Sequence, residues 1–394
     1  MDVVELLRTG RFAEVHGLLA PQLRPLVTPE ALATAWAAAL TEHGALTGSG
    51  APVTEQGVTR VPLEFERGRL TLVLVEGHDG LGGLQIAPAS AAEPIEPWQP
   101  PSYVDCDAFD EHDVSLDGVE GTLSLPAGTG PMPAVVLLSG SGAHDRDETL
   151  GRNKPLKDVA WGLASRGVAV LRFDKVTYQM KTAPPGFTVY DEYAPAALSA
   201  VEFLRQRNDI GPIFLLGHSL GGTIAPRIAA ASADIAGLVL FAGGAQPLHR
   251  AAVRQLRHIG AAEATIEAFT KQAELVDSPA LSVDTPQVEL PFGVPAPYWL
   301  DLRDYDGPAT AAALDVPILI VQGGRDYQVT MADDLALWQA KLDRPNVTVR
   351  VYEADNHLFF PGAGRSMPTE YEPAQHVDPS VVADIAEWLT ALTG

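Results

Sequence analysis

Short apolar segments alternate with segments of helical periodicity along most of the chain after residue 112. Six apolar runs are rich in β-forming side chains and too short for helices; they occupy residues 134–138, 168–173, 213–216, 237–241, 317–321 and 347–352. Helical patterns lie between or after them, at residues 155–166, 191–206, 223–231, 331–342 and 380–392. Two further strands, residues 113–116 and 121–125, predict a hairpin ahead of the first run. Apolar strands separated by helices predict a parallel sheet covered on both faces.

This alternation is interrupted once and is preceded by a different pattern. The interruption is an insertion at residues 243–314, which are helical and then proline-rich. Prolines recur over residues 89–104, and because proline supports neither a helix interior nor a central strand, a stiff linker is predicted. The expected domains are therefore a small α+β domain at residues 1–88 and an α/β domain at residues 105–394. Within the first domain, helices are predicted at residues 11–19 and 29–40 and strands at residues 58–65, 70–75 and 81–86.

Composition restricts the classes of function. The chain has 394 residues, which suits about two domains, and its 46% hydrophobic and 20% charged residues are typical of globular proteins. The net charge of −23 argues against nucleic acid and anionic membranes as partners. The single cysteine, Cys106, rules out an intrachain disulfide. Because the N-terminus lacks a signal-peptide pattern and no apolar run approaches the roughly 20 residues that span a bilayer, a cytoplasmic location is expected.

The most informative motif is G-x-S-x-G at residues 217–221, directly after an apolar run. A serine hydroxyl becomes a nucleophile when a base takes its proton and a sharp turn exposes its oxygen. Gly217 and Gly221 would let the strand and the following helix pack closely around that turn, which is called the nucleophile elbow. Ser219 is therefore the candidate nucleophile, and a glycine-rich turn without chemistry is the alternative.

Polar residues after the last two strands complete a candidate triad. Asp326 follows the run at residues 317–321, and His357 follows the run at residues 347–352. In a parallel sheet these positions meet at the carboxyl edge, where ligands bind. His357 would take the proton of Ser219, and Asp326 would hold the His357 tautomer and stabilise the imidazolium. Other carboxylates lie in the insertion or too close to His357 in sequence: Asp301, Asp304, Asp306 and Asp355.

A serine nucleophile also needs donors for the oxyanion. The elbow supplies the backbone N–H of Leu220. The loop after residues 134–138 contains two glycines, so its amides can turn toward a substrate, and the N–H of Ser141 or of Gly142 is the expected second donor. His144 in the same loop is a further candidate for contact with substrate, although a bond to nearby loop atoms is the simpler interpretation.

These motifs resemble those of α/β-hydrolase-fold serine esterases of the dienelactone-hydrolase and acyl-CoA-thioesterase-like group. The resemblance covers residues 105–394, and its motifs lie at residues 139–148, 171–175, 217–222, 298–306, 322–329 and 356–359. It implies an α/β-hydrolase fold and carboxylic-ester hydrolysis without a cofactor. Residues 1–88 look like an NTF2-like domain that precedes this type of hydrolase, and a homodimer through this domain is an open alternative.

In such a hydrolase the insertion would be a cap over the site, and it offers candidates for an acyl pocket. Phe292, Tyr298 and Trp299 would exclude water and hold an apolar chain, although packing of the cap onto the core is the simpler interpretation for each. The predicted function is hydrolysis of small-molecule esters through an acyl-enzyme. A thioesterase, a peptidase and an acyl-tailoring enzyme of secondary metabolism would use the same triad, and a non-catalytic binding protein of the same fold is the alternative from another class. No motif suggests a metal.

Overall fold

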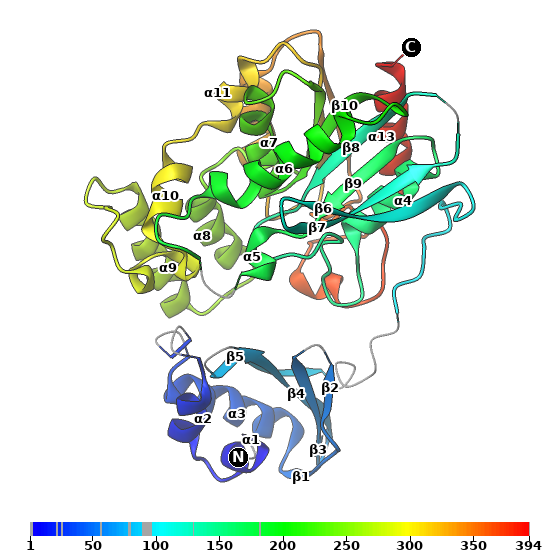
Figure 1. The fold of residues 1–394 in the computed structure, drawn as a ribbon. Coiled ribbons are helices and arrows are strands. Elements are labelled where there is room, and N and C mark those ends of the chain that lie inside the picture. The colour runs from blue at the N-terminus through cyan, green and yellow to red at the C-terminus, as the bar shows by residue number, and fades with distance from the viewer. Residues whose placement is uncertain are drawn as a thin grey trace. The chain divides into compact units, whose positions relative to one another are not determined.

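The chain divides into two compact units, Met1–Glu96 and Pro97–Gly394. The structure is a computed structural model that describes residues 3–20, 23–24, 27–55, 57–77, 80–88, 97–128, 130–180 and 183–393 (Figure 1). Residues 89–96 of the predicted linker lie outside the described residues. Residues 97–104 differ from a free linker, because Trp98 donates its indole N–H to Asp158 at 2.9 Å and packs edge-on against Trp161. Contact between these two aromatic rings therefore fixes residues that the proline pattern assigns to a linker.

The N-terminal unit places three helices beside an antiparallel sheet. The helices are α1 (Val3–Arg8), α2 (Phe12–Leu18) and α3 (Pro29–His43). The strands are β1 (Leu46–Ser49), β2 (Val53–Glu55), β3 (Val58–Phe65), β4 (Gly68–Gly77) and β5 (Gly80–Pro88), in the order β1-β3-β4-β5 with β2 also pairing with β3. Alternate residues of β3 and β4, such as Leu63 and Leu72, are buried with Trp36 of α3. The sequence pattern missed α1, β1 and β2, which are too short for a clear period.

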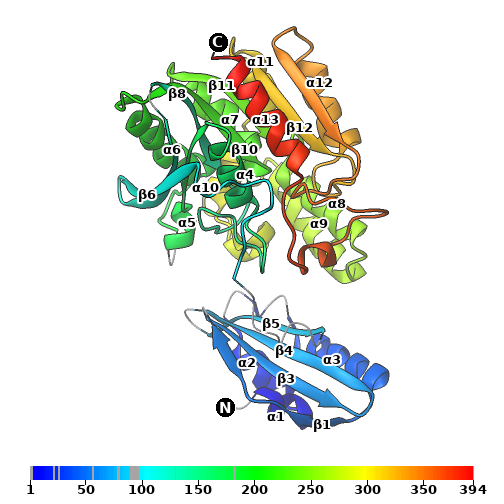
Figure 2. The same ribbon diagram turned by 90° about the vertical axis from the view of Figure 1, so that its right-hand side faces the viewer.

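The second unit is built on an eight-stranded sheet in the order β13-β12-β11-β10-β8-β9-β7-β6 (Figure 2). Its strands are β6 (Phe109–Leu116), β7 (Val119–Pro126), β8 (Met132–Leu138), β9 (Ala169–Phe173), β10 (Ile210–His218), β11 (Ile235–Phe241), β12 (Ile318–Gly323) and β13 (Val347–Tyr352). The six strands from β13 to β9 pair in parallel, and the β6–β7 hairpin adds antiparallel strands at one edge.

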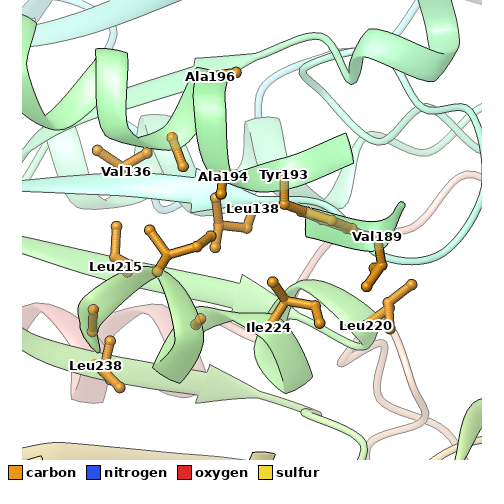
Figure 3. Packing of buried hydrophobic residues seen from close by; sticks show 14 of the residues in the cluster. Val136, Leu138, Val189, Tyr193, Ala194, Ala196, Leu215, Leu220, Ile224 and Leu238 are labelled. Carbon is orange, nitrogen blue, oxygen red and sulfur yellow. The ribbon is translucent and has the colours of Figure 1, made fainter. Parts of the chain in front are cut away.

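The central strands are apolar throughout because helices cover both faces of the sheet. On β8, Val136 and Leu138 belong to the core on one face, and Val135 and Leu137 belong to the core on the other. On the first face, Val136 and Leu138 lie beneath Tyr193 and neighbouring residues of one helix (Figure 3). Side chains alternate between the faces of a strand, so each face buries every second residue.

The helices of this unit lie either outside the insertion or within it. Those outside the insertion are α4 (Pro155–Ala164), α5 (Val176–Gln179), α6 (Val189–Arg205), α7 (Leu220–Ala230), α12 (Ala336–Lys341) and α13 (Pro379–Ala391). Between β11 and β12 lie α8 (Leu248–His258), α9 (Glu263–Asp277), α10 (Ala296–Arg303) and α11 (Gly307–Ala312). Among the described residues, no helix has both the length and the apolar character needed to cross a membrane.

The helix expected over residues 331–342 begins as a single π-helical turn, Met331–Leu335, before α12. Asp334 in this turn is buried, and its carboxylate accepts the backbone N–H groups of Ala245 and Gln246 and pairs with Arg254 at 2.9 Å. A buried carboxylate with these partners anchors the start of the insertion, and the hydrophobic pattern of residues 331–342 carries no sign of it.

Candidate active site

The four predicted parts of the site lie at the carboxyl ends of neighbouring parallel strands. Ser219 follows β10, Asp326 follows β12 and His357 follows β13. The loop that begins at Ser139 follows β8, the parallel neighbour of β10. Residues distant in sequence therefore gather at one edge of the sheet.

Ser219 occupies a strained turn between β10 and α7. Its φ of 51° and ψ of −117° lie outside the regions that a residue with a Cβ ordinarily adopts. A Cβ on Gly217 would collide with the carbonyl of Gly221, and one on Gly221 would collide with the carbonyl of Leu138. The two glycines of the motif are thus required by close backbone approach, and they let α7 begin directly after the serine.

Asp326 and His357 form a buried hydrogen-bonded pair, with His357 Nδ1 at 2.7 Å from Asp326 Oδ2. The other carboxylate oxygen, Oδ1, accepts the backbone N–H groups of Gln328 at 2.7 Å and Val329 at 3.0 Å. Donors held at both oxygens favour the ionised carboxylate, so the proton of the pair resides on Nδ1. The tautomer that follows leaves Nε2 of His357 without a proton, as a general base requires.

Ser219 and His357 are joined through the residue that precedes the serine. The ring of His218 lies 4.7 Å from the ring of His357, centroid to centroid, and His218 Nε2 lies 3.1 Å from the His357 carbonyl oxygen. Among the described residues, which include Ser219 and His357, no hydrogen bond joins the Ser219 hydroxyl to the His357 ring. Catalytic hydrogen bonds are often long before substrate binds and tighten in the complex.

Two buried side chains, those of Lys175 and Tyr193, hold the backbone of the loop after β8 by hydrogen bonds. Lys175 Nζ and the Tyr193 hydroxyl each donate to the carbonyl of Gly140 at 2.9 Å, and Tyr193 also lies 3.0 Å from the carbonyl of Ser139. Because its carbonyls accept these hydrogen bonds, this backbone stretch is held in one orientation. The next residue, Ser141, lines the same cavity as Ser219 and Leu220.

Lys175 is a buried cation with a buried partner. Burial lowers the pKa of Lys175, and the carboxylate of Glu192 opposes that change from 3.1 Å. Glu192 in turn accepts hydrogen bonds from Thr177 at 2.8 Å and from Tyr298 at 2.6 Å. Burial first, and the neighbouring carboxylate second, raise the pKa of Tyr298, so Tyr298 remains a neutral donor. This network links the cap to the loop after β8.

Two cavities adjoin Ser141 of the loop after β8, and Ser219 lines the first of them. The first, of about 480 Å³, has a mixed lining that includes Ser219, Gln255 and Gln328. The second, of about 490 Å³, is mainly apolar and is lined by residues 141–143 of the loop after β8 and by cap residues that include Tyr298 and Trp299. Ser141, Leu248 and Phe292 line both cavities.

Comparison with known proteins assigns the family. A profile of the alpha/beta hydrolase family matches residues 135–374. The chain belongs to the alpha/beta hydrolase family. The fold and the hydrolase class expected from the motifs are confirmed.

The comparisons also give individual relatives of the hydrolase. It is 35% identical to the esterase EstD of Thermotoga maritima over 396 residues, which cover 98% of this chain and 93% of EstD. Among solved structures it is similar to Est1E of Butyrivibrio proteoclasticus, with 16% identity, a TM-score of 0.48 and coverage of 72% of this chain and 98% of Est1E. It is also similar to the esterase Pf2001 of Pyrococcus furiosus, with 17% identity, a TM-score of 0.47 and coverage of 76% and 100%.

The other residues predicted from the sequence differ in their exposure and in whether they line a cavity. Phe292, with a φ of 57°, is 57% exposed, whereas Tyr298 and Trp299 are buried. His144 does not line either cavity formed by the described residues, and its Nε2 lies 2.8 Å from the carbonyl of Ser141. Gly142 lines the second cavity with a φ of 106°. Among the described residues, no cluster of His, Cys, Asp and Glu could hold a metal ion.

Several polar residues of the site were not assigned a role from the sequence. Glu148, Lys175 and His218 all lie inside recognised motifs, and Glu192 and Tyr193 lie on α6. Their signal was present but weak: each is a polar side chain beside an apolar strand or on a helix that the pattern predicts to be buried.

Asp355 is a buried carboxylate two residues before His357, and among the described residues neither of its oxygens has a hydrogen-bond partner. Burial, with the charge of Asp378 second, raises the pKa of Asp355 from 3.8 to about 7. The folded protein therefore holds this proton more tightly than the unfolded chain does, and stability falls as the pH rises from about 4 to about 7.

Asp355→Asn should remove this cost at high pH. We expect its melting temperature at pH 8 to exceed that of the parent by about 2–4 °C for each kcal/mol recovered. The gain should shrink below pH 7 and vanish near pH 4, where the parent is protonated. Thermal unfolding of both proteins at pH 4, 6 and 8 measures it, and a difference independent of pH would show that Asp355 is not the titrating group.

Proposed function

We propose that this protein is a serine esterase that cleaves carboxylic esters through an acyl-enzyme, with Ser219, Asp326 and His357 as its triad. The observation that carries the proposal is the Asp326–His357 pair, whose hydrogen bonds leave Nε2 of His357 free to accept a proton. The strained elbow at Ser219 and the 35% identity to the esterase EstD support the same chemistry.

The reaction follows from this geometry in two halves. Ser219 Oγ attacks the ester carbonyl carbon while His357 Nε2 takes the hydroxyl proton, and Asp326 stabilises the imidazolium. The N–H groups of Leu220 and Ser141, with Gly142 as the alternative to Ser141, would bind the oxyanion. The C–O bond to the alcohol breaks as His357 returns the proton to the leaving oxygen. A water molecule then attacks the acyl-enzyme with His357 again as base, which releases the acid and restores Ser219.

The two cavities suggest where each part of the ester lies. Gln328 and Val329 donate to Asp326 and also line the first cavity, so this cavity lies on the side of the base that protonates the alcohol. The second, apolar cavity adjoins the loop that supplies an oxyanion donor, and it would receive the acyl group. A small or medium acyl chain fits an apolar cavity of about 490 Å³.

Phe292 should limit the length of the acyl chain, because its exposed ring lines both cavities. On p-nitrophenyl esters of two to twelve carbons, we expect the highest kcat/KM at about two to six carbons. Each further buried methylene helps by about 0.8 kcal/mol only where there is room for it. Phe292→Ala should move the optimum to longer chains, and Val283→Ala, at an exposed cap residue outside both cavities, should leave the profile unchanged.

The same panel tests the proposed class. A fluorophosphonate probe should label Ser219, and acyl-CoA thioesters and a peptide amide should be cleaved more slowly than the esters. A preference for thioesters or amides would move the assignment to a thioesterase or a peptidase with the same triad, and preference for a complex acyl donor would indicate a tailoring enzyme. Folded protein that takes no label would favour the non-catalytic binding protein. The cytoplasmic location and a homodimer through residues 1–88, with their NTF2-like character, stay predictions.

A further inference from the structure

One chain of hydrogen bonds connects three of the four parts of the site and uses none of the triad side chains. Glu148 Oε1 accepts the backbone N–H of Gly140 and lies 2.9 Å from His218 Nδ1. His218 Nε2 then lies 3.1 Å from the carbonyl oxygen of His357. Glu148 and His218 are both buried, with 5% and 2% of their surface exposed. The chain therefore runs from the loop after β8, through the elbow, to the loop that carries the base.

The partners of His218 restrict its protonation. A carbonyl oxygen can only accept a hydrogen bond, so Nε2 of His218 must carry a proton to donate one to the carbonyl oxygen of His357. The second proton lies between Nδ1 and Glu148, either on the imidazole or on the carboxyl. The N–H of Gly140, which points at the same oxygen, favours the carboxylate. These hydrogen bonds are therefore best satisfied when His218 is an imidazolium and Glu148 is a carboxylate.

The electrostatic balance favours the same arrangement. Burial acts to raise the pKa of Glu148, but the charge and hydrogen bond of His218 outweigh it and lower that pKa to about 2. Burial likewise acts to lower the pKa of His218, and Glu148 outweighs it, so that this pKa is raised above its usual 6.5. A proton shared between groups shifted in these directions resides on the imidazole at neutral pH.

We propose that His218 is a permanently charged positioning residue. Together with Glu148 it holds the loop after β8 and the loop that carries His357 in place, and its charge favours the neutral form of His357. This inference rests on the proposed esterase function. The positive ring lies 4.7 Å from the His357 ring, so protonation of His357 would bring two cations together. The imidazolium thus keeps the base able to accept the proton of Ser219 at lower pH.

The other groups around His218 are compatible with this role. The ring of Phe241 lies 5.7 Å away at a steep angle and carries no charge. The carboxylate of Asp326 is near enough to favour the imidazolium, and His144 acts on Glu148 in the same direction. Glu148 is the only carboxylate among the described residues in direct contact with the His218 ring.

The protonation state can be observed without measuring turnover. Protein labelled with ¹⁵N in histidine should show protons on both ring nitrogens of His218 from pH 5 to pH 8, with the resonances assigned by their loss in His218→Gln. A neutral ring in this range, with one unprotonated nitrogen, would overturn the proposal. This result does not depend on the esterase assignment, so its failure is distinct from a failure of the proposed function.

Kinetics test the effect on the base. In Glu148→Gln and His218→Gln the imidazolium is lost, so the acid limb of the kcat/KM profile for p-nitrophenyl acetate should move up by about 0.5–1 pH unit. At the pH optimum, kcat should fall about 10-fold or more while KM changes less than about threefold, because each substitution disrupts the hydrogen-bonded chain that ties the loop after β8 to the loop that carries His357.

Asp158→Asn is the matched control. Asp158 is a buried carboxylate on α4 that pairs with His376 at 3.1 Å and accepts the backbone N–H of Val377, away from the site. It should lower stability without moving the acid limb. An acid limb that stays in place in folded Glu148→Gln, or that moves equally in Asp158→Asn, would contradict a specific effect of His218 on the base.

Discussion

Replacing Ser219 with alanine should lower kcat for ester hydrolysis by a factor on the order of 10⁴–10⁶, as for other triad serines. The loss is this large because the serine oxygen forms the covalent bond to the acyl group, and an alanine side chain has no atom that can form it. The backbone should tolerate the change, since the φ of 51° is imposed by the surrounding close packing and alanine is no larger than serine. Initial rates on p-nitrophenyl acetate and labelling by a fluorophosphonate measure the effect.

Ser232→Ala provides the control for this experiment. Ser232 lies just beyond α7 and is partly exposed, and its hydroxyl accepts the backbone N–H of Asp234, so its loss should leave the rate within about twofold of the parent. Circular dichroism should show both variants folded. Folded Ser219→Ala that retained more than about 1% of the parent rate would contradict the role of Ser219 as nucleophile.

The frame of the site was predictable from the sequence because it depends on short-range rules. The strand at 347–352 and the strand that ends at the elbow were recognisable from their apolar side chains, and the chain order of serine, acid and base follows from the order of the strands. Gly217 and Gly221 marked the elbow because their spacing reflects a local contact between a strand and the next helix.

The supports of the site were not predictable in the same way. Glu148 and His218 are separated by 70 positions and Lys175 and Tyr193 by 18, so no local period links them. Their roles depend on which polar groups the folded backbone leaves facing each other. A buried pair of this kind stands out only when its partners are known, because either residue alone resembles an ordinary motif position.

The cap shows a second limit of the sequence. Phe292, Tyr298 and Trp299 were chosen together as large apolar residues, yet they occupy different environments. Tyr298 serves as a hydrogen-bond donor to Glu192, Trp299 is buried, and Phe292 is exposed between two cavities. Side-chain type predicts that such residues pack, but only the fold decides how far each is exposed and which hydrogen bonds it makes.

Asp326→Asn should reduce kcat by up to about 10⁴ while leaving the fold intact. Two backbone N–H groups, those of Gln328 and Val329, point at the position of Oδ1. The amide oxygen of asparagine will take that position, so its NH₂ group must face His357 in place of Oδ2. The ring nitrogen Nδ1 then becomes an acceptor, and the proton of the neutral imidazole moves to Nε2.

That tautomer cannot take the proton of Ser219, which is why an almost isosteric change should have so large an effect. Asp304→Asn is the matched control, because Asp304 lies in the cap at the end of α10 with an exposed side chain that contacts Arg303. It should keep activity within about twofold. Comparison of kcat for the two variants decides the assignment: if Asp326→Asn kept the parent rate and Asp304→Asn lost it, the acid of the triad would be Asp304. The expected order instead follows from the three hydrogen bonds that orient the Asp326 carboxylate toward the base.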